Sequence, residues 1–335
     1  AVVALAAGAF YLAMSGGAVS TSRAFVMVAV MLVAIPVGRR ALTLRAVAVA
    51  ALILLILKPE SLVEAGFQMS FAATTALVFV FGALRDVQRG KLPKWARPVF
   101  AVVLSSLVAG LATAPFSAAI FNRVAHYGLI ANVVSVPVMG MVVVPAAVLA
   151  LCLWPLGLEG VGLWLMERGL AWILAVAGYV AALEGAQGHV ISPGPLVLPL
   201  LALGGLWLVL WRGRGRVAAL LPLALAVGLW SRAERPDLLV SDSGALVGLM
   251  TPQGRALSKP TGDGFATMVW LENDGDGRAQ AEAHDPVALP RRDRVLRLRL
   301  GATEIVQVTG KTALAALDGE DDAGGEVHRL IVAAG

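Results

Sequence analysis

The side chains that could do chemistry in the first 230 residues gather in three short polar segments of an otherwise apolar sequence. These segments read SGGAVSTSRA from Ser15, KPESLVEAGFQMSF from Lys58 and ATAPFSAAIFNRVAHYGLIANVVSVP from Ala112. They supply hydroxyls, side-chain amides, two arginines and one histidine. The serines and the histidine have no paired acid and base beside them, so donors for an anion or for water are the chemistry on offer.

The first segment combines backbone freedom with donors. Gly16 and Gly17 allow the backbone to bend or to approach another segment closely. Ser15 precedes them, and Ser20, Thr21 and Ser22 are suited to capping the helix that follows, which places Arg23 at that helix's entrance. The pattern fits a reverse turn with an N-cap, and it also fits an arginine that meets an anionic substrate at the mouth of a pore.

The second segment puts hydrogen-bonding groups on the first turns of an apolar helix. Ser70 and Thr74 are four residues apart, and Gln68 and Thr75 are seven apart, so they occupy neighbouring stripes of one side. Gly66 comes just before them. Because polar groups that face lipid are costly, this side should face protein or a water-filled cavity. Interhelical hydrogen bonding explains the hydroxyls, whereas the Gln68 amide suits an aqueous path.

The third segment is rich in prolines and ionisable groups. We expect Pro115 to interrupt one helix near its end and Pro137 and Pro145 to interrupt the next, because proline removes a backbone donor. Broken helices at membrane depth line cavities, and ionisable groups there are functional candidates. An exposed loop is the alternative interpretation. The polar residues between the prolines are Asn122, Arg123, His126 and Asn132.

The elements that position these segments are apolar helices. The chain is 58% hydrophobic and 15% charged with a mean hydropathy of +0.80, which is typical of a polytopic membrane protein. Because residue 1 already lies inside an apolar run, we expect a longer protein to begin before it. Nine apolar segments are expected to form helices across about 30 Å of hydrocarbon. They lie at about 1–15, 24–38, 42–57, 66–84, 99–121, 129–153, 161–183, 195–211 and 216–230.

Charge predicts the orientation of these helices. Residues 1–230 hold 15 Lys+Arg and 6 Asp+Glu, while residues 231–335 hold 12 and 16. The loops after even-numbered helices carry most of the basic residues, whereas those after odd-numbered helices carry only Arg23, Lys58 and Arg123. Since Lys and Arg accumulate on the cytoplasmic side, the even loops are predicted to be cytoplasmic. All three polar segments and the tail then lie on the other side.

Residues 231–335 are predicted to form a small α+β domain. Short β-branched runs predict strands at DLLVS, LVGLM, FATMVWL, VLRLRLG, TEIVQV and RLIVAA, with a short helix at 311–317. The acidic stretch from Glu272, ENDGDGRAQAEA, starts like a calcium loop but has Ala283 where a bidentate glutamate is needed. Its Asp-Gly repeats favour a hairpin turn.

The three polar segments, in their order and spacing, closely resemble the competence domain of the ComEC family over residues 1 to about 190. The resemblance implies an inner-membrane channel that imports single-stranded DNA from the periplasm in natural transformation. It implies that family regions preceding residue 1 are missing. The path would be lined by the polar-segment residues: Ser15, Gly16, Gly17, Ser20, Arg23, Gly66, Gln68, Ser70, Thr74, Pro115, Asn122, Arg123, His126 and Asn132.

The resemblance also implies partners and a limit on chemistry. Expected partners are the DNA strand, the bilayer, a periplasmic DNA-binding protein, a cytoplasmic translocase and further copies of the chain. Many family members end in a metallo-β-lactamase-like domain, but the tail, with only His284 and His328, lacks the H-x-H-x-D-H cluster. We therefore expect no metal, no cofactor and no enzyme activity. A membrane-embedded hydrolase using Ser70 or His126 and a small-anion transporter remain alternatives.

Overall fold

In the computed structural model, contacts divide the chain into two compact units. The structure describes residues 1–36, 38, 42–91, 93, 96–292, 295–301, 303–310 and 328–334; for 85–91, 292, 328–331 and 333–334 this covers the backbone alone. The first unit comprises 1–120, 124–188 and 198–226. The second comprises 121–123, 189–197 and 227–335. The chain is mainly α-helical and ends in a small region that contains strands, as predicted.

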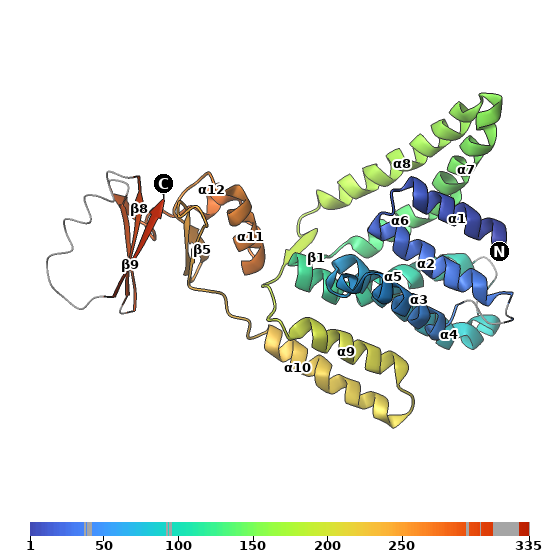
Figure 1. The fold of residues 1–335 in the computed structure, drawn as a ribbon, viewed down its shortest axis with the longest axis horizontal. Helices are drawn as coiled ribbons and strands as arrows, with labels where there is room; N and C mark the ends of the chain where they lie inside the picture. Colours follow the sequence, from blue (N-terminus) through green and yellow to red (C-terminus); the bar gives the residue numbers. More distant parts are fainter. Residues whose placement is uncertain are drawn as a thin grey trace. The chain divides into compact units, whose positions relative to one another are not determined.

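The first unit begins with antiparallel helices packed in sequence order (Figure 1). These are α1 (Val2–Met14), α2 (Val19–Ala34), α3 (Leu44–Leu57) and α4 (Ala65–Lys91), with the short 3₁₀ helix η1 (Pro59–Val63) before α4. Side chains of α3 and α4 form a core of Val47, Ala50, Leu54, Phe67 and Phe71, against which α2 also packs. This packing brings the turn between α1 and α2 to the same end as η1.

The next elements are longer apolar helices. They are α5 (Ala96–Phe121), α6 (Gly128–Val138), the π-helical turn η2 (Met139–Val143), α7 (Val144–Leu153), η3 (Trp154–Leu156) and α8 (Glu159–Ala181). The short strands β1 (Arg123–Ala125) and β2 (Gln187–His189) follow the C-terminal ends of α5 and α8 and pair with each other. The last helices are α9 (Val197–Leu210), η4 (Arg214–Ala219) and α10 (Leu220–Trp230), of which residues 198–226 belong to the first unit.

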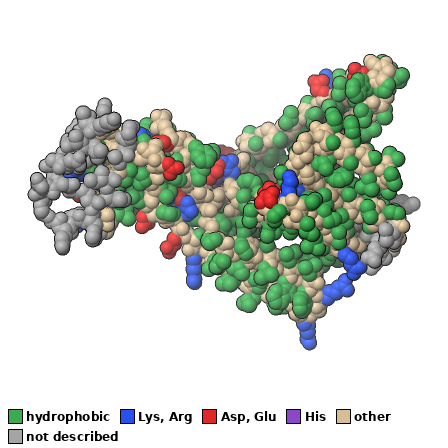
Figure 2. Space-filling view, in the orientation of Figure 1, with side chains coloured by type: hydrophobic (Ala, Val, Ile, Leu, Met, Phe, Trp, Pro, Cys, Tyr) green, Lys and Arg blue, Asp and Glu red, His purple; other side chains and the backbone are tan. Residues whose placement is uncertain are grey.

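Length and composition make four of the described helical segments able to cross a membrane. They are Ala65–Leu84, Ala96–Phe121, Gly128–Leu156 and Glu159–Ala181. Shorter apolar helices occupy Val2–Met14, Val19–Ala34, Leu44–Leu57 and Val197–Leu210. All of these coincide with segments expected from hydropathy. Figure 2 shows hydrophobic side chains spread over the visible face of the helices, as a surface in contact with lipid tails requires.

Small residues let the helices approach one another. Because lipid tails are as apolar as leucine, helices in a bilayer are held by close packing more than by the hydrophobic effect. Ala146 and Ala150 of α7 are buried four residues apart, and the buried Gly162 of α8 lies against Ala150, while the buried Gly169 lies against Val143 of η2. A Cβ on Gly162 would lie 2.4 Å from the Ala150 backbone nitrogen, so α7 and α8 meet backbone to backbone.

Prolines interrupt these helices less than the sequence analysis predicted. Pro115 lies inside α5, which continues to Phe121, so the prediction that it interrupts the helix is wrong. Its missing N–H leaves only the carbonyl of Leu111 without the usual partner. Pro137 lies inside α6, and Pro145 lies in α7 directly after the π-helical turn η2, in a helical segment that continues from Gly128 to Leu156. The π-helical turn η2 lies between them.

The second unit contains two antiparallel-dominated sheets. The first pairs β3 (Leu238–Val240), β4 (Val247–Thr251) and β5 (Gly254–Leu257) in that order. The second pairs β6 (Arg291–Arg292), β7 (Val295–Leu300), β8 (Thr303–Thr309) and β9 (His328–Ala334), and only β8 and β9 run parallel. Leu246, Leu257, Leu271 and Ala283 form one core, and Val247, Ala256, Leu289 and Leu296 another.

Two predictions for the tail were wrong. FATMVWL is not a strand but part of α11 (Gly264–Asp274), whose buried Thr267 and Leu271 lie four residues apart on one side. The stretch from Glu272 is not a hairpin turn, because it ends α11 at the left-handed Gly275 and leads to α12 (Gln280–Ala283). The helix predicted at 311–317 lies outside the described residues, while the other five predicted strands are confirmed as β3, β4, β7, β8 and β9.

Candidate functional site

The first polar segment forms a tight turn followed by α2. Gly16 and Gly17 both have positive φ, +65° and +67°, which favour glycine. The predicted side-chain cap is wrong, because the N-cap is Ala18 and no side chain caps the helix. The Ser22 hydroxyl instead donates back to the Gly17 carbonyl. As α2 starts at Val19, Arg23 lies inside the helix and not at its entrance.

Arg23 reaches across to the start of α4 and meets the second polar segment. Its Nη1 lies 3.9 Å from Oε2 of Glu64, and the side chain is only 15% exposed. Its guanidinium lies against Gly66, where a Cβ would be 2.7 Å from both Nη1 and Nη2. The glycine therefore provides the space that the guanidinium occupies. Glu64 belongs to the quoted segment but was absent from the predicted site residues.

Gln68 lies in the first turn of α4, four residues after Glu64, and only one end of its side-chain amide is hydrogen-bonded. Its Nε2 donates to the Leu62 carbonyl at 3.0 Å. Its Oε1 is buried and has no hydrogen-bond partner among the described residues, and the same is true of Nε of Arg23. Buried polar atoms without partners are uncommon. Two such atoms therefore occur within one junction, which we define as Arg23, Glu64, Gly66 and Gln68.

Two hydroxyls of the predicted path are bonded within their own helices. The Ser15 hydroxyl donates to the Leu12 carbonyl at 2.8 Å, and the Thr74 hydroxyl donates to the Ser70 carbonyl at 2.8 Å. Such back-bonding satisfies the hydroxyl locally and still leaves its oxygen able to accept. Ser70 is partly buried and Ser20 is exposed. Whether any of them lines a path stays a prediction.

The third polar segment divides between the two units. Asn122 is 4% exposed with φ +55°, and its side chain donates to the Val190 carbonyl at 3.3 Å, while its own carbonyl accepts from the Val190 N–H. Asparagine tolerates this left-handed conformation, so the residue has a clear role in ending α5. Arg123 pairs with Glu272 of α11. These two residues belong to the second unit.

His126 and Asn132 belong to the first unit. Nδ1 of His126 is 2.7 Å from the Gly185 carbonyl, and the ring lies against Gly188 of β2. Asn132 is exposed on α6. The structure therefore brings the first and second polar segments together at the junction, and it engages part of the third with β2 and α11.

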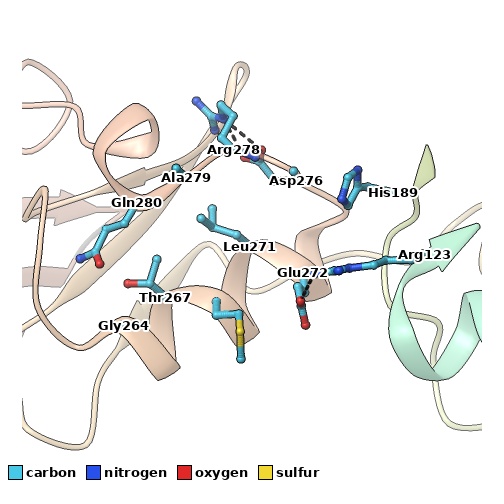
Figure 3. Close-up of a pocket in the computed structure, with 12 residues that line it drawn as sticks. Arg123, His189, Gly264, Thr267, Leu271, Glu272, Asp276, Arg278, Ala279 and Gln280 are labelled. Carbon is cyan, nitrogen blue, oxygen red and sulfur yellow. Dashed lines mark hydrogen bonds and ion pairs between the residues drawn. The ribbon is translucent and has the colours of Figure 1, made fainter. Parts of the chain in front are cut away.

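The second unit holds a pocket of about 240 Å³ beside α11 (Figure 3). Its two arginines, Arg123 and Arg278, are each paired with a carboxylate, Glu272 and Asp276. Burial would raise the pKa of Asp276, but hydrogen bonds from the Arg278 side chain and backbone, together with the charges of Arg278 and His189, lower it. In turn, the hydrogen bond to Asp276 and its negative charge raise the pKa of Arg278.

Arginines also form ion pairs with Asp274, the last residue of α11. Asp274 accepts from the fully buried Arg255 and from Arg235. Arg255 donates further to the carbonyls of Gly248 and Pro236. Among the described residues no group of three His, Cys, Asp or Glu side chains could hold a metal ion. The acidic stretch from Glu272 thus acts as a set of ion pairs that tie the unit together.

The comparisons with known proteins decide the family. The family model described as Competence protein matches residues 1–215, more than half of the chain. The chain belongs to the competence protein family. This confirms the resemblance to the ComEC type that the polar segments indicated. No curated protein and no solved structure matches the chain.

The family match includes most of the apolar helices. The match covers α1 to α9 and all three polar segments, and it ends before the strands of the second unit. Together with the helices long enough to span a bilayer, it identifies a membrane protein with a role in competence. The junction residues all lie within the matched range.

Proposed function

We propose that this competence-family protein forms a channel that imports single-stranded DNA across the bacterial inner membrane during natural transformation. The family match over residues 1–215 carries the proposal. The junction supports it, because a cation and an amide with unused hydrogen-bonding capacity lie together at one end of the helices. Phosphates need such donors, while a lining with many cations would trap the strand.

In this proposal the strand passes the outer ends of α2 and α4. Arg23 contacts successive phosphates, and Gln68 offers its unpartnered Oε1 acceptor and the second hydrogen of Nε2, which suit water or bases. The polar ends and the second unit face the periplasm, and the basic loops face the cytoplasm. A periplasmic DNA-binding protein delivers the strand, a cytoplasmic translocase draws it in, and further copies of the chain complete the pore.

Labelled-DNA uptake in a transformable host tests the function. Deletion of the gene should abolish entry of label into the cytoplasm and leave DNA binding at the surface intact. Arg23→Ala and Gln68→Ala should reproduce that loss at a normal protein level in the membrane. The matched control is Leu52→Ala, since Leu52 is 60% exposed on α3. Normal transformation by the deletion strain would refute the proposal.

A further inference from the structure

Arg23 is held across the junction by a partner that does not bind it tightly. The closest approach to Glu64 is 3.9 Å, from Nη1 to Oε2, which permits attraction but is too long for a hydrogen bond. Its Nε is buried without a partner among the described residues. A guanidinium carries five N–H donors in a rigid fork. Arg23 therefore keeps donors free while its charge is balanced.

The start of α4 fixes where that guanidinium can lie. Gly66 leaves open the volume that a Cβ would fill at 2.7 Å from Nη1 and Nη2. Ser61 of η1 is 4% exposed, and Phe67 is 6% exposed in the core shared with α3. The backbone on both sides of Glu64 is thus anchored. Glu64 itself is 37% exposed and accessible from outside.

In this arrangement the Glu64 carboxylate and a phosphate of the strand would compete for the Arg23 guanidinium. A carboxylate and a phosphodiester both accept from a guanidinium, and an arginine fork binds either of them well. Two anions on one arginine repel each other, so a nearby carboxylate weakens a phosphate contact. An arginine without such a competitor would hold each phosphate longer.

We propose that Glu64 is a positioning residue that holds Arg23 between phosphates and displaces each phosphate as the strand moves on. The ligand class is the phosphodiester backbone of single-stranded DNA. The inference rests on the proposed function. It adds that the rate of passage depends on Glu64, and not only on Arg23.

Glu64→Gln tests the proposal, because it removes the charge and keeps the shape. We expect a normal protein level, normal DNA binding at the surface and a passage rate lowered by about tenfold, which corresponds to about 1.4 kcal/mol of repulsion removed between the two anions. Glu64→Asp should retain most of the rate. Glu60→Gln is the matched control, since Glu60 is exposed on η1, four residues before Glu64, and the change in charge is equal. It should pass DNA at the wild-type rate.

A charge reversal distinguishes the proposed role of Glu64 in phosphate release from a purely structural ion pair that holds α2 against α4. The double variant Arg23→Glu with Glu64→Arg restores the ion pair but places an anion where the phosphate contact is proposed. We expect a normal protein level and severely reduced uptake. Recovery of wild-type uptake by the double variant would overturn the inference. So would a Glu64→Gln variant that passes DNA at the wild-type rate, or one whose uptake falls only in proportion to its protein level.

The outcome for the proposed function is read separately. If uptake survives deletion of the whole gene, the proposed function fails and this inference fails with it. If deletion abolishes uptake and Glu64→Gln leaves it unchanged, the inference alone fails.

Discussion

Gly66→Ala should displace the Arg23 guanidinium without destabilising the fold. The new Cβ would lie 2.7 Å from Nη1 and Nη2 of Arg23 and 3.0 Å from Cζ. Ordinary contact requires the guanidinium to move by about 0.7 Å or more. Because the group is the end of a flexible side chain, α4 need not move. Alanine favours helix over glycine by about 0.5–1 kcal/mol, so the protein level should not fall.

The effect on uptake follows from the contact that is lost. Hydrogen bonds to charged groups contribute about 1.5–3 kcal/mol, so displacement of Arg23 should lower the rate of DNA entry by about 10- to 100-fold. The assay compares internalised label with membrane protein level. Gly82→Ala is the control, since Gly82 lies on the same helix and a Cβ there meets nothing within 4 Å. Wild-type uptake by Gly66→Ala at a normal level would refute the reasoning.

Three further predictions concern stability in detergent. Gly162→Ala should lower the melting temperature of the chain because its Cβ meets the α7 backbone, whereas Gly160→Ala, which meets nothing within 4 Å, should not; scanning fluorimetry compares them. Arg255→Ala leaves the buried Asp274 with Arg235 alone and removes the donor to the Gly248 and Pro236 carbonyls, so it should destabilise the second unit by about 1–3 kcal/mol in urea-dependent proteolysis, while the exposed Arg232→Ala should cost little. Asp276→Asn should cost about 1 kcal/mol or less at pH 7, because Arg278 is partly exposed. The lowered pKa of Asp276 means that this cost is present above the ordinary value of 3.8 and vanishes as the pH falls through the folded-state value; an unchanged cost in acid would contradict the assignment.

Hydropathy predicted the helices well because an apolar run long enough to span a bilayer has few alternatives there. The errors came from local patterns that fit two structures. FATMVWL has the β-branched and aromatic residues of a strand, yet Thr267 and Leu271 are buried at helical spacing. Gly275 after Asp274 reads equally as a hairpin or as a helix C-terminus, and the left-handed glycine ends α11.

The candidate site was predictable in part. Arg23 and Gln68 were identified as polar groups near helix ends and Gly66 as a residue of the same path, and the structure places all three where α2 meets the start of α4. Glu64 was missed, although a single carboxylate one turn before Gln68 was a usable signal. Asn122 needed the fold, because only the pairing with Val190 shows its left-handed backbone to be held in place.

Cross-linking of DNA in transit tests the central claim that the strand passes the outer ends of α2 and α4. Cys152→Ser removes the natural thiol, and Ser70→Cys then places a near-isosteric thiol one turn from Gly66. Leu52→Cys, on the exposed side of α3, is the control. With a thiol-reactive DNA strand stalled during uptake, we predict cross-links at position 70 and none at position 52. Uptake that proceeds while position 70 remains unlinked, or equal cross-linking at both positions, would contradict the account.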